Sequence, residues 1–235
     1  LICMNLFYAP DFSSENPILP EGESKHAIRV LRMRQGDPIF VVDGKGNWYE
    51  GEVLTENAKR CEVEILIHKE DIGKVTYHLH MAVAPTKNND RFEWFLEKAT
   101  EIGISEITPI WCQNSERKKL NIDRCERILV SAMKQSLKSY LPKFNEPKHF
   151  SQFIAEVSES ERLIAHCEPG EKKHLKNIPS NQSTLILIGP EGDFSPDEIE
   201  KASQNDFKAI SLGENRLRTE TAAIAACQTV YLAHV

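Results

Sequence analysis

The sequence predicts an α/β protein with a smaller N-terminal β domain, and three observations lead to this prediction. Short segments of strand character fill residues 39–68, whereas strands and helices alternate from about residue 75 onward. Such alternation is typical of βαβ units that build a mainly parallel sheet. In addition, glycine-containing loops at 189–192 and 212–219 each follow a strand and precede a helix. The chain has 235 residues, which is enough for one large or two modest domains.

The N-terminal part is expected to be a small antiparallel, barrel-like β unit. Its segments alternate polar and apolar side chains and are separated by turn residues. The polar stretch 69–74 is the expected linker. We therefore place one domain at 1–72 and a second at 75–235. The expected strands of the first domain are 39–43, 48–56 and 60–68, with a turn at 44–47.

The C-terminal part alternates between the two periodicities. A strand that ends at Pro85 precedes a helix whose apolar residues share one face, and Gly103 ends that helix. The last helix is rich in alanine. The expected strands are 77–84, 107–111, 162–167, 184–188 and 208–211, and the expected helices are 92–103, 123–137, one from 196 onward, and 220–233.

Composition excludes several classes of protein. The chain is 40% apolar and 27% charged, which is ordinary for a globular protein, and its net charge is −6. No run of about 18 apolar residues is present, and we expect neither a transmembrane helix nor a signal peptide. The six cysteines are scattered without a CxxC pair, so we expect no zinc site, no disulfide framework and a cytoplasmic location.

Basic residues cluster locally despite the acidic total. Residues 24–36 hold several cations and no acid, and the stretch 115–143 is also rich in lysine and arginine. Local basic patches, not net charge, attract a phosphate backbone. Two interpretations remain open for each stretch: contact with RNA, or an ordinary solvated face. The cations of the first stretch are Lys25, Arg29, Arg32 and Arg34, beside His26.

The segment 184–199 is the most informative part of the chain. An apolar run stops at Gly189-Pro190, and Glu191 lies at the apex of the loop that follows. In open α/β sheets, ligands bind at the carboxyl ends of strands in crevices of this kind. The alternative is an ordinary β-α connection.

The helix after this loop has a well-marked start. Ser195 is the expected N-cap, Pro196 the first helical residue, and Glu198 the second half of a capping box. Phe194 and Ile199 occupy the positions of a hydrophobic staple. The sequence therefore predicts a rigid helix start directly behind the loop.

The second loop repeats this arrangement. Residues 211–218 follow a strand, and Thr219 is the expected N-cap of the final helix, where Glu220 suits the positive helix terminus. The alanines at the start of that helix permit close approach of another backbone. The two loops could line one pocket together, or they could be two ordinary connections.

Several familiar site signatures are absent from the sequence. It contains no Gly-x-Gly-x-x-Gly after a strand, no Gly-Lys-Ser/Thr loop and no nucleophile elbow. No cluster of His, Cys and Asp has metal-ligand spacing, so we expect no metal. His149, His166 and His174 are isolated, and we expect each to be satisfied or solvated.

Taken together, the motifs resemble one family. Gly189-Pro190-Glu191-Gly192, Leu212-Gly213 and residues 217–222 are similar to the RsmE-type ribosomal RNA methyltransferases of the SPOUT superfamily. The similarity extends over nearly the whole chain. Further matching positions are Asn5 to Tyr8, His26, Val30 to Arg32, Gly36-Asp37, Pro85, Lys87, Arg91, Glu93, Lys98, Glu101, Gly103, Ser115 to Arg117 and Gln135-Ser136.

The resemblance implies a fold and a reaction. The family methylates N3 of one uridine in 16S ribosomal RNA of the small subunit, with S-adenosyl-L-methionine as methyl donor, and it acts as a homodimer. Its members combine an N-terminal PUA-like β-barrel domain, which helps to hold RNA, with a C-terminal SPOUT-type trefoil-knotted α/β methyltransferase domain. We expect the same fold class here, with the cofactor in the knot loops.

The resemblance also implies site residues. The cofactor-binding set would be His166, Cys167, Glu168, Leu187, Ile188, Gly189, Pro190, Glu191, Gly192, Leu212, Gly213, Leu217, Arg218 and Thr219. The RNA-binding set would be Lys25, His26, Arg29, Arg32, Arg34, Lys87, Arg91, Arg117 and Lys138.

The chemistry suggests catalytic candidates. Uridine N3 carries a proton at neutral pH, so a site must accept that proton or stabilise the anion that its loss leaves. Arg218 is the candidate for the electrostatic partner, because arginine is a permanent cation. Glu191 or Glu220 could accept the proton, and each could equally be a helix-terminus or salt-bridge residue.

The chain departs from the family pattern at a few positions. Asp193 stands where a second glycine is usual, Asn215-Arg216 replaces an arginine followed by an aliphatic residue, and Lys138 replaces an arginine. Asp193 is expected to restrict the backbone of its loop and to add charge near the cofactor. Two other functions remain open: a SPOUT enzyme that acts on another base or a ribose, and a non-catalytic RNA-binding assembly factor.

Overall fold

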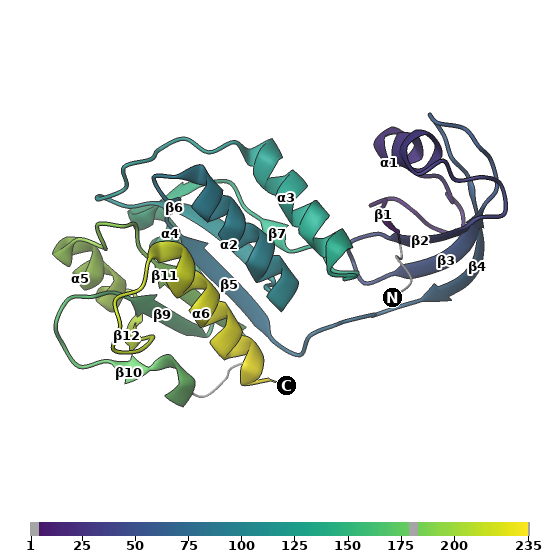
Figure 1. The fold of residues 1–235 in the computed structure, drawn as a ribbon. Helices are drawn as coiled ribbons and strands as arrows, with labels where there is room; N and C mark the ends of the chain where they lie inside the picture. Colours follow the sequence, from purple (N-terminus) through teal and green to yellow (C-terminus); the bar gives the residue numbers. More distant parts are fainter. Residues whose placement is uncertain (1–4, 179–182, 235) are drawn as a thin grey trace. The chain divides into compact units, whose positions relative to one another are not determined.

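The computed structural model describes residues 5–178 and 183–234 (Figure 1). The chain forms two compact units. One consists of Leu1–Lys74 and Val130–Leu141, and the other of Val75–Leu129 and Pro142–Val235. We call them the N-terminal unit and the C-terminal unit. Within the described residues, no helix combines the length and the apolar character needed to cross a membrane.

The N-terminal unit contains one sheet in the order β1-β2-β3-β4. β2, β3 and β4 pair antiparallel, as expected for residues 39–68, and β1, for which no strand was predicted, pairs with β2 in parallel. β1 has three residues, too few to carry a recognisable alternation. Among the described residues no pairing joins β4 to β1, so the hydrogen-bonded path is open. The strands are β1 (Leu6–Tyr8), β2 (Pro38–Val42), β3 (Trp48–Val53) and β4 (Val63–Lys69).

Two short helical segments that the sequence did not predict carry most of the first basic stretch. α1 (Glu21–Lys25) continues directly into a π-helical turn at His26–Val30. Leu19 and Ala27 belong to the buried core of this unit together with Phe7. Of the four cations of the stretch, Lys25 and Arg29 lie on these segments, whereas Arg32 and Arg34 follow them.

The C-terminal unit is built on a parallel sheet in the order β10-β12-β9-β11-β5-β6-β7, with β8 also pairing with β6. Every pairing between its described strands is parallel, as the alternating pattern predicted. The strands are β5 (His78–Val83), β6 (Glu106–Trp111), β7 (Lys143–Phe144), β8 (Lys148–His149), β9 (Glu161–Ala165), β10 (Lys173–His174), β11 (Ser183–Ile188) and β12 (Lys208–Ser211).

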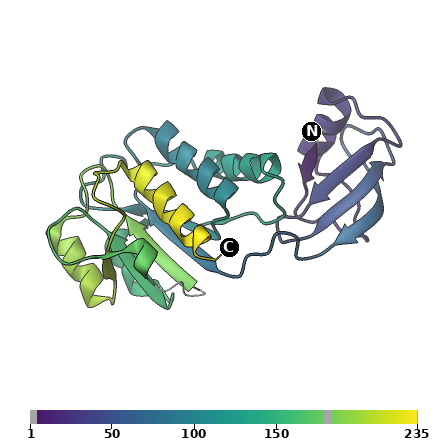
Figure 2. The ribbon, with the colours of Figure 1, turned by 60° about the horizontal axis from the view of Figure 1, so that its bottom comes forward.

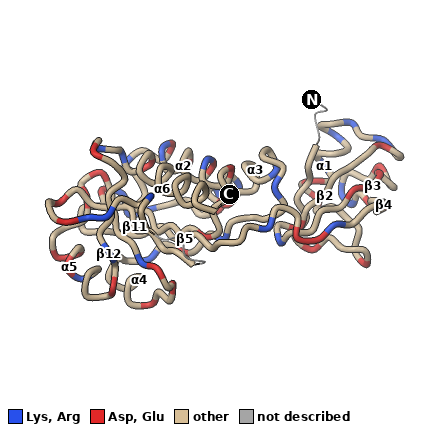
Figure 3. The backbone as a smooth tube through the Cα atoms, turned by 90° about the horizontal axis from the view of Figure 1, so that it is seen from below, with Lys and Arg blue, Asp and Glu red and all other residues tan. Residues whose placement is uncertain are grey.

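Helices cover both faces of this sheet. α2 packs against α6, and α6 also packs on β5 and β11, whereas α4 packs against α5. Figures 2 and 3 show α2 and α6 on one side of the strands, and Figure 3 shows α4 and α5 on the other. Coverage on both faces explains why five of the six residues in each of β5 and β11 are buried. The helices are α2 (Asn89–Ile102), α3 (Ile122–Gln135), α4 (Phe150–Glu156), α5 (Pro196–Gln204) and α6 (Thr219–Leu232), with a 3₁₀ turn at Leu175–Asn177.

Two predicted helix boundaries, the end of α2 and the start of α5, are confirmed. Gly103 ends α2 in the left-handed conformation, with φ of 118°. At the start of α5, Ser195 Oγ accepts from Glu198 N at 3.3 Å, and the Glu198 carboxylate accepts from Ser195 N at 2.9 Å. Phe194 and Ile199 belong to one apolar cluster, as the staple required. The loop before α5 is therefore anchored at its C-terminal end.

Candidate functional site

A cavity of about 800 Å³ lies at the carboxyl ends of β9, β11 and β12. Because β9 is placed between β11 and β12, the loops after all three strands meet at one edge of the sheet. The prediction that the two glycine loops line one pocket is thus confirmed. The lining residues are Ala165 to Glu168, Lys172, Ile188 to Asp193, Ile210 to Thr219 and Ala222.

All but one of the predicted cofactor-binding residues line this cavity. Leu187 does not, because it is fully buried in the apolar cluster that includes Leu185 and Phe207. On the strand its side chain points to the opposite face from that of Ile188. Leu187 therefore packs in the apolar core behind the cavity wall and does not line the cavity.

The loop after β11 is held from two directions. Gly189 is buried against Phe194, so that a Cβ at position 189 would lie 3.1 Å from the phenyl ring. From the loop after β6, the Asn114 side-chain amide donates to the carbonyls of Gly192 and Asp193, both at 3.1 Å. The backbone of this cavity wall is thus fixed before any ligand arrives.

Asp193 lies in this loop as well. It adopts the left-handed conformation that a glycine would supply, with φ of 62°. Its backbone N–H donates to Pro190 O at 2.9 Å and closes a turn. Its carboxylate accepts from Cys167 N at 2.6 Å and from Phe194 N at 2.8 Å. This side chain therefore links the loop after β9 to the loop after β11.

The start of α6 also differs from the expectation. Thr219 is not the N-cap: Arg218 holds that position with extended dihedral angles, and Thr219 is the first helical residue. The buried Thr219 hydroxyl donates instead to Gly189 O at 3.0 Å. Further along α6, Ala223 and Ala226 are fully buried. The small side chains let the helix start lie close to the Gly189 loop.

The exit of β9 forms the third wall. Lys172 Nζ donates to His166 O at 2.7 Å and to Glu168 O at 2.5 Å. Burial, with the charge of Lys172, lowers the pKa of His166, and burial, with the charge of Asp193, raises the pKa of Cys167. Both side chains are therefore uncharged at neutral pH, and their backbone and apolar surfaces shape this wall.

The catalytic candidates lie in three different settings. Arg218 lines the cavity. Glu191 also lines it, but its Oε1 accepts from Lys87 N at 2.9 Å. Glu220 is 8% exposed at the first turn of α6; its Oε1 is 3.8 Å from Arg91 Nε, and within the described part of the chain its Oε2 has no hydrogen-bond partner.

The predicted RNA-binding residues fall into two groups, one in each unit. In the C-terminal unit, Lys87 pairs with Glu116 at 2.7 Å, and Arg117 Nε donates to Lys87 O at 3.0 Å, which places these cations together. In the N-terminal unit, Lys25 and Arg34 form exposed ion pairs with acids of the same unit. The first group is Lys87, Arg91 and Arg117, and the second is Lys25, His26, Arg29, Arg32, Arg34 and Lys138.

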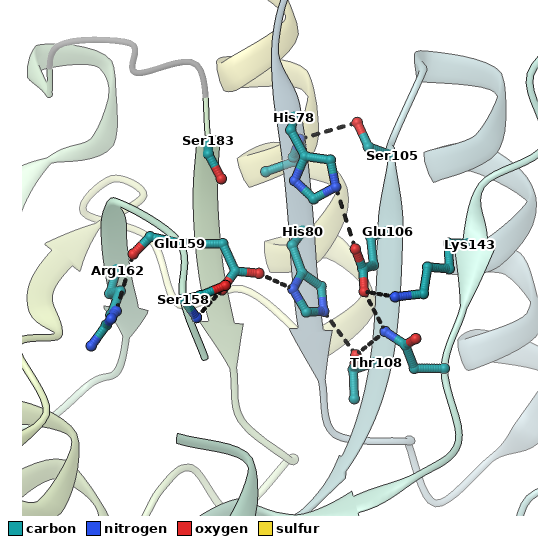
Figure 4. A network of polar contacts seen from close by, with 12 residues as sticks. His78, His80, Ser105, Glu106, Thr108, Lys143, Ser158, Glu159, Arg162 and Ser183 are labelled. Atoms are coloured by element: carbon teal, nitrogen blue, oxygen red, sulfur yellow. Dashed lines mark hydrogen bonds and ion pairs between the residues drawn. The ribbon is translucent and has the colours of Figure 1, made fainter. Parts of the chain in front are cut away.

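Sequence reasoning missed a second polar cavity, of about 550 Å³, at the amino ends of β5 and β6 (Figure 4). There the buried His80 binds Glu159 through Nδ1 and Thr108 Oγ1 through Nε2, the latter at 2.7 Å. Burial alone would raise the pKa of Glu159, but His80 outweighs it and lowers that pKa to about 2. Lys143 pairs with Glu106 at 2.9 Å beside them. The network joins strands that are distant in sequence, so no local pattern could reveal it.

The described residues show neither a metal-holding cluster nor a disulfide. Among residues 5–178 and 183–234, no group of three or more His, Cys, Asp and Glu side chains is arranged to hold a metal ion. None of the five cysteines in that part of the chain forms a disulfide, and Cys3 lies outside it.

Comparison with known proteins identifies the family to which this chain belongs. Residues 74–231 match the model of an RNA methyltransferase domain, and residues 19–66 match that of an RNA methyltransferase PUA domain. The chain is 33% identical to the ribosomal RNA small subunit methyltransferase E of Mesomycoplasma hyopneumoniae, over 84% of this chain and 86% of that protein. The chain belongs to the RsmE-type RNA methyltransferase family. The resemblance read from the motifs is thereby confirmed.

Solved structures of the family superpose on the whole chain. A probable rRNA methyltransferase from Porphyromonas gingivalis is 40% identical, with a TM-score of 0.90 and 98% of both chains covered. A putative methyltransferase from Legionella pneumophila, solved with the cofactor SAM, is 28% identical, with a TM-score of 0.88 and coverage of 99% of this chain and 98% of that one. The family fold therefore extends through both units.

Proposed function

We propose that this chain uses S-adenosyl-L-methionine to methylate N3 of a specific uridine in 16S rRNA of the small ribosomal subunit. The single observation that carries the proposal is the cavity where the loops after β9, β11 and β12 converge, in a chain of the RsmE-type family. A similar protein of known structure binds SAM. The choice of uridine N3 rests on the family resemblance.

The cavity suits this cofactor. Its volume of about 800 Å³ lies within the range of small-molecule sites. Ile188, Ile210 and Leu217 supply apolar surface for an adenosyl group, while the glycine loops expose backbone amides and carbonyls to polar groups. The bound cofactor supplies an electrophilic methyl group on a sulfonium.

In the proposed reaction the N3–CH₃ bond forms as the S–CH₃ bond breaks, and the N3 proton leaves for a base. Arg218, a permanent cation on the cavity wall, stabilises the negative charge that develops on the uracil oxygens. We propose Glu220 rather than Glu191 as the proton acceptor. Glu191 lines the cavity, but its Oε1 is engaged by Lys87 N. Glu220 is not a lining residue, but it directly follows Thr219, which is, and its buried Oε2 has no partner among the described residues.

RNA binding would combine both groups of cations. Lys87, Arg91 and Arg117 lie in the C-terminal unit together with the cavity, where they suit phosphates next to the target base. The N-terminal unit, which matches a PUA domain model, would hold another part of the RNA. From the resemblance we also propose a homodimer, a trefoil knot in the segment that carries the cavity loops, and a cytoplasmic location.

The decisive experiment identifies the methylated nucleoside. Purified protein is incubated with labelled SAM and small ribosomal subunits that lack the modification, and the digested RNA is analysed by mass spectrometry. We expect 3-methyluridine at one position of 16S rRNA. Label on a ribose, on another base or on transfer RNA alone would refute the proposed specificity, and absence of SAM binding would indicate a non-catalytic RNA-binding protein.

A variant tests the proposed role of Arg218. Arg218→Ala should lower the single-turnover rate by roughly 100-fold or more, which is the usual effect of removing one electrostatic stabiliser. Arg127→Ala is the matched control, because Arg127 is an exposed residue of α3 whose guanidinium donates to Asp123 O in its own helix. Equal rates for the two variants would contradict the assignment.

A further inference from the structure

Asp193 is an unusual component of the cavity wall. Among the described residues of that wall it is the non-glycine residue with positive φ, at 62°. An L-residue pays a conformational cost there that a glycine does not, although aspartate tolerates the region better than most side chains. An aspartate at this position is expected to contribute a hydrogen bond or a charge that glycine cannot.

Both carboxylate oxygens of Asp193 are used. Oδ2 accepts from Cys167 N at 2.6 Å, and Oδ1 accepts from Phe194 N at 2.8 Å. The first bond joins two loops that follow neighbouring strands, 26 residues apart in sequence. Charge-assisted bonds to backbone amides are among the stronger hydrogen bonds in proteins. Asp193 therefore ties the loop after β9 to the loop after β11.

The charge of Asp193 also reaches the cavity. It acts against the burial that lowers the pKa of His166, and it adds to the burial that raises the pKa of Cys167. Both of these residues line the cavity. The other charged residues of the wall are Glu168, Lys172, Glu191, Glu214, Arg216 and Arg218.

We propose that Asp193 both positions the loop after β9 and makes the cavity prefer the cationic methyl donor to its neutral product. Methyl transfer converts a sulfonium into an uncharged thioether, so donor and product differ by one positive charge. A fixed carboxylate on the wall stabilises the donor selectively and favours exchange of S-adenosylhomocysteine for a new donor. This inference rests on the proposed function, because that function defines the two ligands.

Two substitutions compare the charge with the loop bond. Asp193→Asn keeps the size and the tolerance of positive φ, removes the charge and leaves one acceptor oxygen, which can still accept from Cys167 N. Asp193→Gly suits the backbone but removes both the charge and the bond to Cys167 N. Asp206 provides the matched control, because it is also an aspartate with positive φ, 64°, in the same unit, and it does not line the cavity.

The test is isothermal titration of the full chain with SAM and, separately, with S-adenosylhomocysteine. We expect Asp193→Asn to reduce the preference for SAM over S-adenosylhomocysteine by roughly three- to tenfold, as fits one partly exposed charge. Asp193→Gly should reduce that preference equally and weaken both ligands further, while Asp206→Asn and Asp206→Gly leave both affinities within twofold. Urea unfolding of each variant checks that the protein remains folded.

The outcomes distinguish this inference from the proposed function. Sinefungin, which carries an amine in place of the sulfonium, should follow SAM in its response to Asp193→Asn. If wild type binds both ligands and Asp193→Asn leaves their ratio unchanged, the charge role is wrong. If Asp193→Gly weakens neither ligand more than Asp193→Asn, the positioning role is wrong. If wild type binds neither SAM nor S-adenosylhomocysteine, the proposed function itself fails.

Discussion

Replacing Thr219 by valine should weaken the link between the start of α6 and the Gly189 loop while keeping the volume of the side chain nearly unchanged. Valine has nearly the same volume, so the substitution removes only the hydroxyl that donates to Gly189 O at 3.0 Å. Both residues are buried, and Thr219 is 6% exposed. Water can therefore reach the Gly189 carbonyl, which has lost its donor, only if the start of α6 moves away from the loop.

The structure sets the size of the effect. A hydrogen bond contributes about 0.5–1.5 kcal/mol net, and a buried polar group left without a partner costs about 1–3 kcal/mol. Some relaxation is available at a helix terminus, so we expect the free energy of unfolding to fall by about 1–2 kcal/mol. Because the same bond fixes Gly189 in the cavity wall, SAM affinity should fall by roughly five- to tenfold.

Urea unfolding and calorimetric titration with SAM measure the two effects. Thr229→Val is the matched control, since the Thr229 hydroxyl donates to Ala225 O at 2.8 Å within the same helix. Its loss leaves a carbonyl that is still in the helical ladder, so we expect less than about 0.5 kcal/mol. Thr219→Ser should restore most of the SAM affinity. If Thr219→Val and Thr229→Val behave alike in both assays, the link between α6 and the Gly189 loop does not order the site.

Three other predictions use SAM titration, single-turnover methylation or unfolding. Gly192→Ala would place a Cβ 3.1 Å from Asn114 Cβ, so SAM affinity should fall severalfold; in an Asn114→Gly background, which lacks that Cβ, Gly192→Ala should cost less affinity only if that contact is the cause. Glu220→Gln should lower single-turnover methylation by roughly 100-fold with SAM binding unchanged, and a parallel loss of binding would assign Glu220 to structure instead. Glu159→Gln should destabilise the protein by about 1–3 kcal/mol at pH 7. Since the pKa of Glu159 lies at about 2, below its usual 4.5, the wild-type advantage should be full above pH 4.5 and vanish as pH falls toward 2; a gap independent of pH would contradict this.

Much of the fold follows from local patterns. The parallel sheet was predicted because buried strands and amphipathic helices alternate, and the starts and ends of helices followed from Gly103 and from the Ser195 capping box. The segments that were missed are short. β1, β7, β8, β10, α1 and α4 have between two and seven residues, too few for a clear period to emerge, and they form because neighbouring elements supply partners.

The candidate site divides in the same way. Its loops were recognisable because glycine and proline interrupt apolar strands, and a family motif covers them. The bonds within it were not recognisable: Thr219 was expected to cap its own helix but bonds to Gly189, 30 residues earlier. Glu191 accepts from Lys87 N, 104 residues away. Bonds of this range depend on which strands are neighbours, and that order is a property of the whole sheet.

By itself, the sequence determined the class of fold, the positions of the cavity loops and the family, because these depend on local periodicity, turn residues and short motifs. Only the tertiary structure decided that β9 lies between β11 and β12, so that three strand exits share one cavity. It also decided the part played by Asp193, which the sequence marks only as a departure from glycine. The reason is physical, because the role of a carboxylate depends on the amide donors around it. One of these donors, Cys167 N, lies beside Asp193 because β9 pairs with β11, not because the two residues are close in sequence.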